Sequence, residues 1–282
     1  MVLLVKDKKR IETENLTKAR GHLVIKRNDF IQKSRHQLSL QEQKVILYLI
    51  SKVKPTDKDF ENQVFSIVEF CKICGLDDDS GKNYSNLKNT LQSLRDRSVW
   101  VEFEDGRRTT LAWLNKVTIK ERSGLIELKL DNDLKPFLLE LQENFTQYEL
   151  IYTLAMRSQY STRLYELLKS YQFKKHVTFD VDELKKLLFA ETYKLGKDFR
   201  KRVLDTAVTE INKLTDILVT YELIKVGRKF AEVKFQITQK NTGERLNAWV
   251  TIDKKLNSKE DVAGNAQFEI LEGQLTLEQN IN

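Results

Sequence analysis

Two stretches of the chain, 114 positions apart, share one pattern of apolar and polar residues. Residues 65–74 (FSIVEFCKIC) align without gaps with residues 179–188 (FDVDELKKLL). In each copy an aromatic residue precedes a capping residue, and Glu follows three positions after the cap, as in Ser66-x-x-Glu69. This spacing is that of a capping box, so it predicts the start of a short helix in both copies.

The segments around the two copies also correspond. Apolar residues three and four positions apart predict a helix before each copy, at residues 39–52 and 158–173, and a longer helix after it, at residues 84–97 and 197–214. An internal repeat of this kind indicates two related structural units.

Alternation of apolar and polar residues follows each long helix and predicts strands. The expected strands are residues 99–103, 110–119 and 125–130 in the first unit, and 217–221 and 233–237 in the second. Turn residues at 104–108 and 227–229 join them into hairpins. The order helix, strand, helix, helix, hairpin, present twice, predicts an α+β fold of two tandem winged-helix domains.

The same patterns suggest where the units begin and end. We expect a basic flexible arm at residues 1–27, a first winged helix at 28–135, a second at 136–240, and a polar, disordered tail at 241–282. Residues 131–148 are expected to form an ordered connector between the units.

Charge suggests the kind of partner. The net charge is +7 with a pI near 9.1, and residues 241–282 hold 4 Lys/Arg against 7 Asp/Glu, which leaves +10 on residues 1–240. A basic body fits a polyanion such as nucleic acid, although a solvated basic surface would have the same charge. No apolar run is long enough to cross a bilayer, and the short apolar start followed by charge reverses the order of a secretory signal. A cytoplasmic location without membrane contact is expected.

The second unit carries the clearest candidate DNA-binding residues. In helix-turn-helix folds the second helix of the motif enters the major groove. The long helix places Lys197, Arg200, Lys201, Thr209 and Asn212 opposite its apolar face, with Arg202 and Lys213 beside them. The expected wing tip adds Arg228 and Lys229, suited to phosphate or minor-groove contact.

The first unit offers fewer such residues. Its candidates are Lys82, Asn83, Tyr84 and Lys88 at the start of the long helix, and Arg107 and Arg108 on its expected wing. This unit is therefore expected to contact the DNA backbone, to dimerise, or to do both in different states.

Residue patterns typical of enzymes are missing from the sequence. Cys71-x-x-Cys74 has no second pair for a structural zinc site, and the repeat predicts Cys74 in the core and Cys71 on the surface. The chain has neither a phosphate-binding loop nor the His-x-His pair that a metal-dependent nicking enzyme would need. We expect a protein that is not an enzyme and needs no cofactor or metal.

Three segments resemble iteron-binding plasmid replication initiators of the RepA, RepB and RepE type. Residues 28–48 contain an asparagine followed by LSLQEQKVILY, close to the family pattern L(S/T)xxEqrlixxli. Residues 157–168 (RSQYSTRLYELL) and 199–212 (FRKRVL…EIN) are similar to the family's "RlYellk" helix and its recognition helix. The resemblance spans about residues 24–240, in the family's order.

The resemblance implies both a fold and a function. Such initiators consist of two winged helices, of which the second reads tandem repeats at an origin and the first dimerises or contacts DNA backbone. Monomers open the origin with host replication proteins, and dimers repress the initiator's own promoter. Carried over by position, Lys197, Arg200, Lys201 and Asn212 fall on the recognition helix, and Arg228 and Lys229 on the wing.

The sequence leaves two other hypotheses open. A dimeric winged-helix transcriptional regulator would share the fold but lack origin activity. A rolling-circle nicking enzyme would cleave a strand with a tyrosine and a metal ion.

Overall fold

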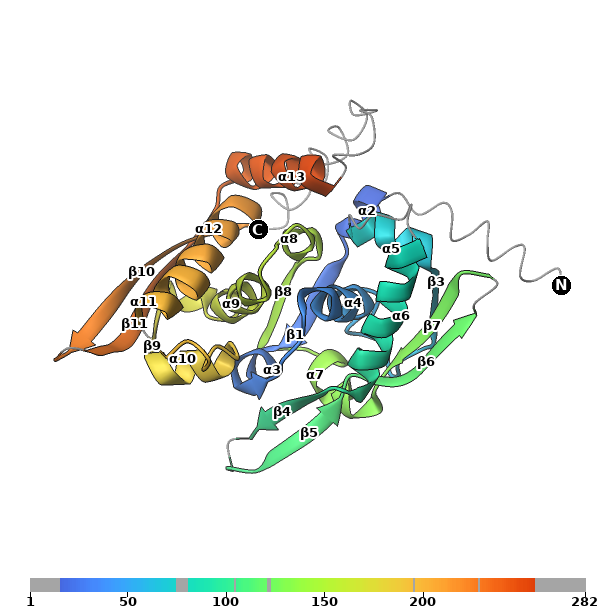
Figure 1. Cartoon of the computed structure of the whole chain (residues 1–282), viewed down its shortest axis with the longest axis horizontal. Helices are drawn as coiled ribbons and strands as arrows, with labels where there is room; N and C mark the ends of the chain where they lie inside the picture. Colours follow the sequence, from blue (N-terminus) through green and yellow to red (C-terminus); the bar gives the residue numbers. More distant parts are fainter. Residues whose placement is uncertain are drawn as a thin grey trace.

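The computed structural model describes residues 16–74, 81–103, 105–120, 123–194, 196–227 and 229–256. Within these ranges the chain forms two runs of helices and strands that pack side by side (Figure 1). Their buried apolar residues form one continuous core that includes members of both runs.

The order helix, strand, helix, helix, hairpin occurs in both runs. The first comprises α4 (Leu40–Ser51), β3 (Gln63–Ser66), α5 (Ile67–Cys74), α6 (Gly81–Asp96), β6 (Leu114–Lys120) and β7 (Leu125–Leu130). The second comprises α9 (Gln159–Ser170), β9 (His176–Asp180), α10 (Val181–Leu187), α11 (Gly196–Phe199), a π-helical segment (Arg200–Asp205), α12 (Thr206–Leu214), β10 (Ile217–Val226) and β11 (Lys229–Gln239). The predicted pair of winged helices is confirmed.

The repeated helix starts form as the sequence predicts. Ser66 Oγ accepts a hydrogen bond from the backbone N–H of Glu69 at 2.9 Å. Asp180 Oδ1 accepts from the N–H groups of Asp182 and Glu183, also at 2.9 Å. In each case a side-chain oxygen satisfies amides that lack a partner in the first turn.

The strand pairing places the first wing later in the chain than the sequence pattern predicts. In the second unit β9 pairs with β11, and β11 pairs with β10. In the first unit β3 pairs with β7, and β7 pairs with β6, so β6–β7 corresponds to the second wing.

The hairpin predicted as the first wing is a separate feature. Strands β4 (Ser98–Glu102) and β5 (Arg108–Ala112) form a sheet with β2 (Ser34–Arg35) and do not pair with β3. The predicted return strand is divided at the buried Trp113 into β5 and β6. Arg107 and Arg108 therefore lie outside the hairpin that matches the second wing.

The expected N-terminal arm is ordered over its described part. Helix α2 (Leu16–Arg20) leads into β1 (Leu23–Arg27), which pairs with β8 (Phe145–Glu149). The expectation of a mobile arm is wrong for these residues, because β1 buries Val24 and Lys26. The expected ordered connector between the units contains the single-turn helix α7 (Lys135–Leu138) and most of β8.

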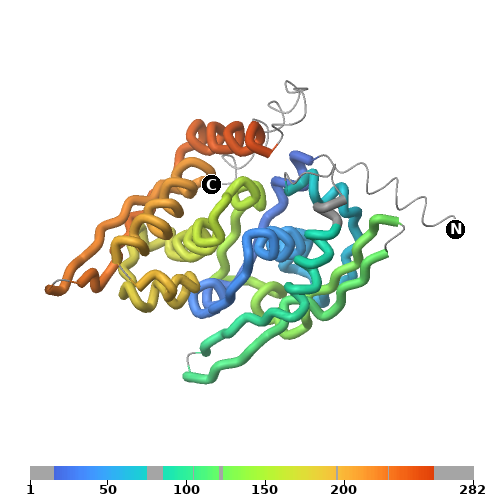
Figure 2. The backbone as a smooth tube through the Cα atoms, viewed as in Figure 1, coloured from blue at the N-terminus to red at the C-terminus, as the bar shows by residue number. Residues whose placement is uncertain are grey.

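The expected disordered tail is also wrong for residues 242–256. They form α13 (Thr242–Leu256), which packs against α12 and against α8 (Ile151–Leu154) and buries Trp249 and Ile252. Figures 1 and 2 show this helix at the edge of the molecule near α2. The remainder of both expected segments, 1–15 and 257–282, lies outside the described residues.

A buried arginine ties the two terminal helices together. Arg20 Nη1 of α2 lies 3.1 Å from Asp253 Oδ1 of α13. The same guanidinium donates to the carbonyl oxygens of Ile73 and Lys72 at the end of α5. One side chain thus joins the end of a first-unit helix to a helix that packs on the second unit.

Helix α9 lies at the junction of the two units, where it is buried on nearly all sides. Glu166 Oε1 accepts hydrogen bonds from Lys26 Nζ at 2.5 Å and from the Tyr148 hydroxyl at 2.6 Å. Arg163 Nη2 donates to the carbonyl oxygens of Ile31 and Ser34, each at 2.7 Å. Burial lowers the pKa of Lys26, an effect that the Glu166 carboxylate opposes.

Two smaller expectations have different outcomes. Cys74 is buried as predicted, and burial raises the pKa of its thiol to about 12. Cys71 is also buried, so its predicted place on the surface is wrong. Among the described helices none is both long and apolar enough to cross a bilayer.

We expect Glu166→Gln to lower the free energy of unfolding by about 3 kcal/mol, because it leaves the Lys26 charge buried without its counterion. Urea unfolding followed by circular dichroism measures this change. Glu143→Gln, which neutralises an exposed carboxylate in the loop before β8, is the matched control and should change stability by about 0.5 kcal/mol or less. Equal stability of the two variants would show that the buried pair contributes nothing.

Candidate nucleic-acid interface

The helical run from Gly196 to Leu214 has one apolar and one basic face. The sequence predicts the buried residues Phe199, Val203, Ala207, Ile211 and Leu214, and all five are buried, together with Leu204. Of the predicted DNA-binding residues on this helix, those exposed are Lys197, Arg200, Lys201, Arg202, Thr209 and Lys213. The exposed cations are concentrated in the first two turns.

The wing beside this helix is a long hairpin that extends from the body of the molecule (Figure 1). Val226 pairs with Lys229, and Gly227 between them has a φ of 62°, a conformation that glycine adopts without strain. Lys229 is exposed, whereas Arg228 lies outside the described residues.

Two further exposed residues near the wing tip are not among the predicted DNA-binding residues. Lys225 is exposed, with its Nζ 5.1 Å from the centre of the Phe230 ring, and Val226 is 71% exposed. They end the strand of alternating apolar and polar residues. Their position beside the glycine turn is the feature of the sequence that could have placed them at the wing tip. They extend the exposed surface of the tip beyond the predicted pair.

Close contacts hold the wing against the helical run from Gly196 to Leu214, the candidate recognition helix. A Cβ atom added to Gly196, the first residue of α11, would lie 2.9 Å from Cδ2 of Phe230 in β11. Farther along, the Tyr221 hydroxyl of β10 donates to Asp205 Oδ1 at 2.5 Å. Helix and wing therefore present one combined surface.

Asn212 belongs to this joint and not to the exposed face. Its side-chain Nδ2 donates to the carbonyl oxygen of Val219 at 2.9 Å, and its Oδ1 accepts from the Val219 N–H at 2.7 Å. Both polar ends of the amide are thus used by the backbone of β10. The sequence pattern places Asn212 on the face opposite the apolar stripe, whereas the structure places it half-buried between helix and strand.

Glu210 likewise acts within the fold. Its carboxylate accepts hydrogen bonds from the N–H groups of Arg157 and Ser158 at the start of α9, at 3.0 to 3.3 Å. The EIN segment that resembles an initiator recognition helix therefore supplies two structural contacts. One fixes the helix to α9, and the other fixes it to β10.

The candidates in the first unit are spread over two elements. Lys88 is exposed on α6, and the backbone of Lys82, Asn83 and Tyr84 forms the first turn of the same helix. The side chains of these three lie outside what the structure describes.

The other first-unit candidates lie at the end of the β4–β5 hairpin. Arg107 Nε lies 2.6 Å from Asp105 Oδ2, and Arg108 Nε lies 3.1 Å from Glu102 Oε2. All four side chains are exposed, so water screens these ion pairs and each contributes little stability. Their carboxylates offset the positive charge available at this hairpin.

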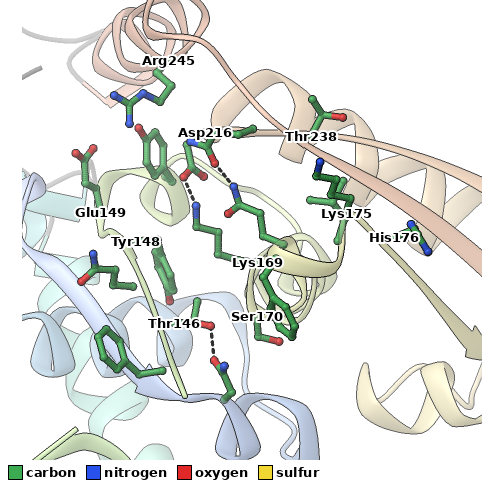
Figure 3. Close-up of a pocket in the computed structure, with 18 of the residues that line it drawn as sticks. Thr146, Tyr148, Glu149, Lys169, Ser170, Lys175, His176, Asp216, Thr238 and Arg245 are labelled. Atoms are coloured by element: carbon green, nitrogen blue, oxygen red, sulfur yellow. Dashed lines mark hydrogen bonds and ion pairs between the residues drawn. The ribbon is translucent and has the colours of Figure 1, made fainter. Parts of the chain in front are cut away.

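A groove of about 1350 Å³ lies elsewhere, along β8, the end of α9, β9 and β11 (Figure 3). Lys169 and Asp216 form an ion pair within it, and Thr146 Oγ1 donates to Asn28 Oδ1 at 2.6 Å. None of the predicted DNA-binding residues lines this groove. Across the described ranges, no three His, Cys, Asp or Glu side chains are grouped so that they could hold a metal ion.

We expect Asn212→Ala to lower the free energy of unfolding by about 1–3 kcal/mol, because it removes the side-chain hydrogen bonds to the N–H and the carbonyl oxygen of Val219. Lys213→Ala, an exposed neighbour on the same helix, should change it by about 0.5 kcal/mol or less. Chemical unfolding of both variants measures the difference. Unchanged stability of Asn212→Ala would contradict its assignment to the helix–wing joint.

Comparison with known proteins places these two units in a family. The family model described as "Initiator Replication protein, WH1" matches residues 23–169, and "Initiator Rep protein, WH2" matches residues 180–237. The Escherichia coli PI protein is 34% identical over 134 residues, which cover 40% of this chain and 43% of that protein. The chain thus spans less than half the length of this curated relative.

A solved structure has the same fold. The crystal structure of Pi initiator protein in complex with iteron DNA matches with a TM-score of 0.64 at 21% identity, over 79% of this chain and 99% of that chain. The resemblance seen in the sequence is confirmed by the two family matches. The chain belongs to the family of initiator replication proteins with two winged helices, WH1 and WH2.

Proposed function

We propose that this protein is a plasmid replication initiator that binds tandem origin repeats, or iterons, in double-stranded DNA. Binding opens the adjacent DNA and recruits host initiator and helicase proteins in the cytoplasm. As a dimer, the protein represses its own promoter. It is not an enzyme, since binding and bending of DNA supply the energy for opening.

One observation carries this proposal: the exposed cations of the recognition helix and the wing form one surface. Lys197, Arg200 and Lys201 lie in the first two turns of the helix, and Lys229 lies at the wing tip. In winged-helix proteins these are the positions that meet the major groove and the neighbouring phosphates. The similar Pi initiator protein was crystallised with iteron DNA.

The placement of these cations also indicates an anionic partner. The N-terminus of a helix carries a partial positive charge, so basic side chains in the first turns are unfavourable there. Phosphate groups bound at this end of the helix would attract both the basic side chains and the partial positive charge of the helix N-terminus. Their binding would also release counterions from the DNA. DNA binding would thus offset the electrostatic repulsion between these side chains and the helix N-terminus in the free protein.

The first unit supports a secondary role. Its α6 carries the exposed Lys88 but shows fewer cations than the recognition helix, and the arginines of the β4–β5 hairpin are already paired with carboxylates. Such a surface suits backbone contact or self-association better than base reading. A dimeric transcriptional regulator on the same fold is the alternative, and it would bind an inverted repeat without origin activity.

We expect Lys201→Ala to weaken binding to duplex DNA from the region flanking this gene by about 1–3 kcal/mol if Lys201 contacts a base. A phosphate contact would instead lower the salt dependence of binding by about one counterion. Fluorescence anisotropy over a salt series distinguishes the two. Lys58→Ala removes the same charge from an exposed loop of the first unit and is the control. Identical isotherms for both variants would contradict the proposed surface.

A further inference from the structure

The recognition helix contains a local change of helical geometry at its most basic part. Residues Arg200–Asp205 form a π-helical segment between α11 and α12. Such segments insert about one residue into a helix and occur often at functional sites. Two consecutive residues of this segment, Val203 and Leu204, are buried.

The π-helical segment brings together two side chains that an α-helix would separate. Residues five apart in an α-helix point in directions about 140° apart. Here Arg200 Nε lies 3.9 Å from Asp205 Oδ2, and both side chains are about half exposed. The Arg200 guanidinium also lies close enough to the Tyr221 hydroxyl to lower the pKa of that phenol.

The wing fixes the Asp205 carboxylate from the other side. Tyr221 of β10 donates its hydroxyl hydrogen to Asp205 Oδ1 at 2.5 Å. Burial, reinforced by the hydrogen bond to Asp205, raises the pKa of the Tyr221 phenol to about 12. The phenol therefore remains protonated at neutral pH and keeps its role as a donor.

An acidic residue at this position needs a compensating role. Asp205 is half exposed on a helix whose neighbouring side chains, Lys201 and Arg202, are exposed cations. A carboxylate near DNA phosphates opposes binding, because like charges repel. The carboxylate holds two groups, the Tyr221 hydroxyl and the Arg200 guanidinium, and of these Arg200 is the cation on the exposed basic face.

We propose that Asp205 is a positioning residue that orients the Arg200 guanidinium toward a base edge. Tyr221 on the wing holds the Asp205 carboxylate in place through its hydrogen bond. The group recognised is a guanine in the major groove, whose O6 and N7 accept two parallel hydrogen bonds from an arginine fork. This inference rests on the proposed function and adds a specificity mechanism to it. Asp205 itself does not touch DNA.

The test compares binding to repeat-containing DNA and to random-sequence DNA for the full chain. Removing the carboxylate charge in Asp205→Asn should strengthen binding to random DNA while it lowers the ratio of specific to random affinity about 10-fold. Tyr221→Phe keeps the Asp205 carboxylate but removes its hydrogen bond from the wing, and it should lower the same ratio by a smaller factor. Glu222→Gln removes an exposed charge from the same strand, and it should leave the ratio unchanged.

A double-mutant cycle with Arg200→Ala separates positioning from simple repulsion. The loss caused by Asp205→Asn should disappear when Arg200 is already alanine, since contacting residues are not additive. The proposal is overturned if the loss persists in that background, or if Asp205→Asn changes both affinities by one common factor. Equal affinity of the unmodified protein for repeat and random DNA would instead overturn the proposed function, so the two failures are distinguishable.

Discussion

The buried contacts of helix α9 determine how the two winged helices are joined. The helix begins the second run of elements but lies almost wholly within the WH1 match. Its Glu166 and Arg163 make their hydrogen bonds with residues of β1, α3 (Asn28–Lys33), β2 and β8. Charged groups in such a site are stable only when paired, which makes the arrangement specific. A shift of one unit against the other would leave the Lys26 and Arg163 charges without partners.

The same helix also positions the recognition helix. Glu210 caps the start of α9, and Lys169 near its end is paired with Asp216, next to the start of β10. Helix α12 packs along α9 between these two points. Asn212 and Tyr221 join this helix to the wing, so the candidate DNA-binding surface is connected to the first unit through α9.

The sequence predicts features that depend on local patterns. The capping residues Ser66 and Asp180 and the apolar stripe of the recognition helix could be predicted because each depends on neighbours within a few positions. The pairing of β1 with β8 could not, since it joins segments more than a hundred residues apart with no periodic signal. Helix α13 did have a local signal: Asn241 and Glu244 form a reciprocal cap before an apolar stripe.

Side-chain roles were less predictable than elements. Asn212 has the spacing of an exposed helical residue, but the backbone of β10, seven residues later, binds it. The π-helical segment likewise changes which residues share a face, so Asp205 and Arg200 could not be paired from an α-helical pattern. The buried Cys71 lies on α5, which packs against α2, a helix that the sequence pattern did not predict.

DNase I footprinting on the DNA flanking this gene is the most direct test of the central claim, that the second winged helix reads repeated origin DNA. Several repeats in the same orientation should be protected, each on one face of the duplex, as expected for a helix in successive major grooves. Protection of a single inverted repeat at the promoter, with no other protected site, would contradict it and favour a dimeric transcriptional regulator.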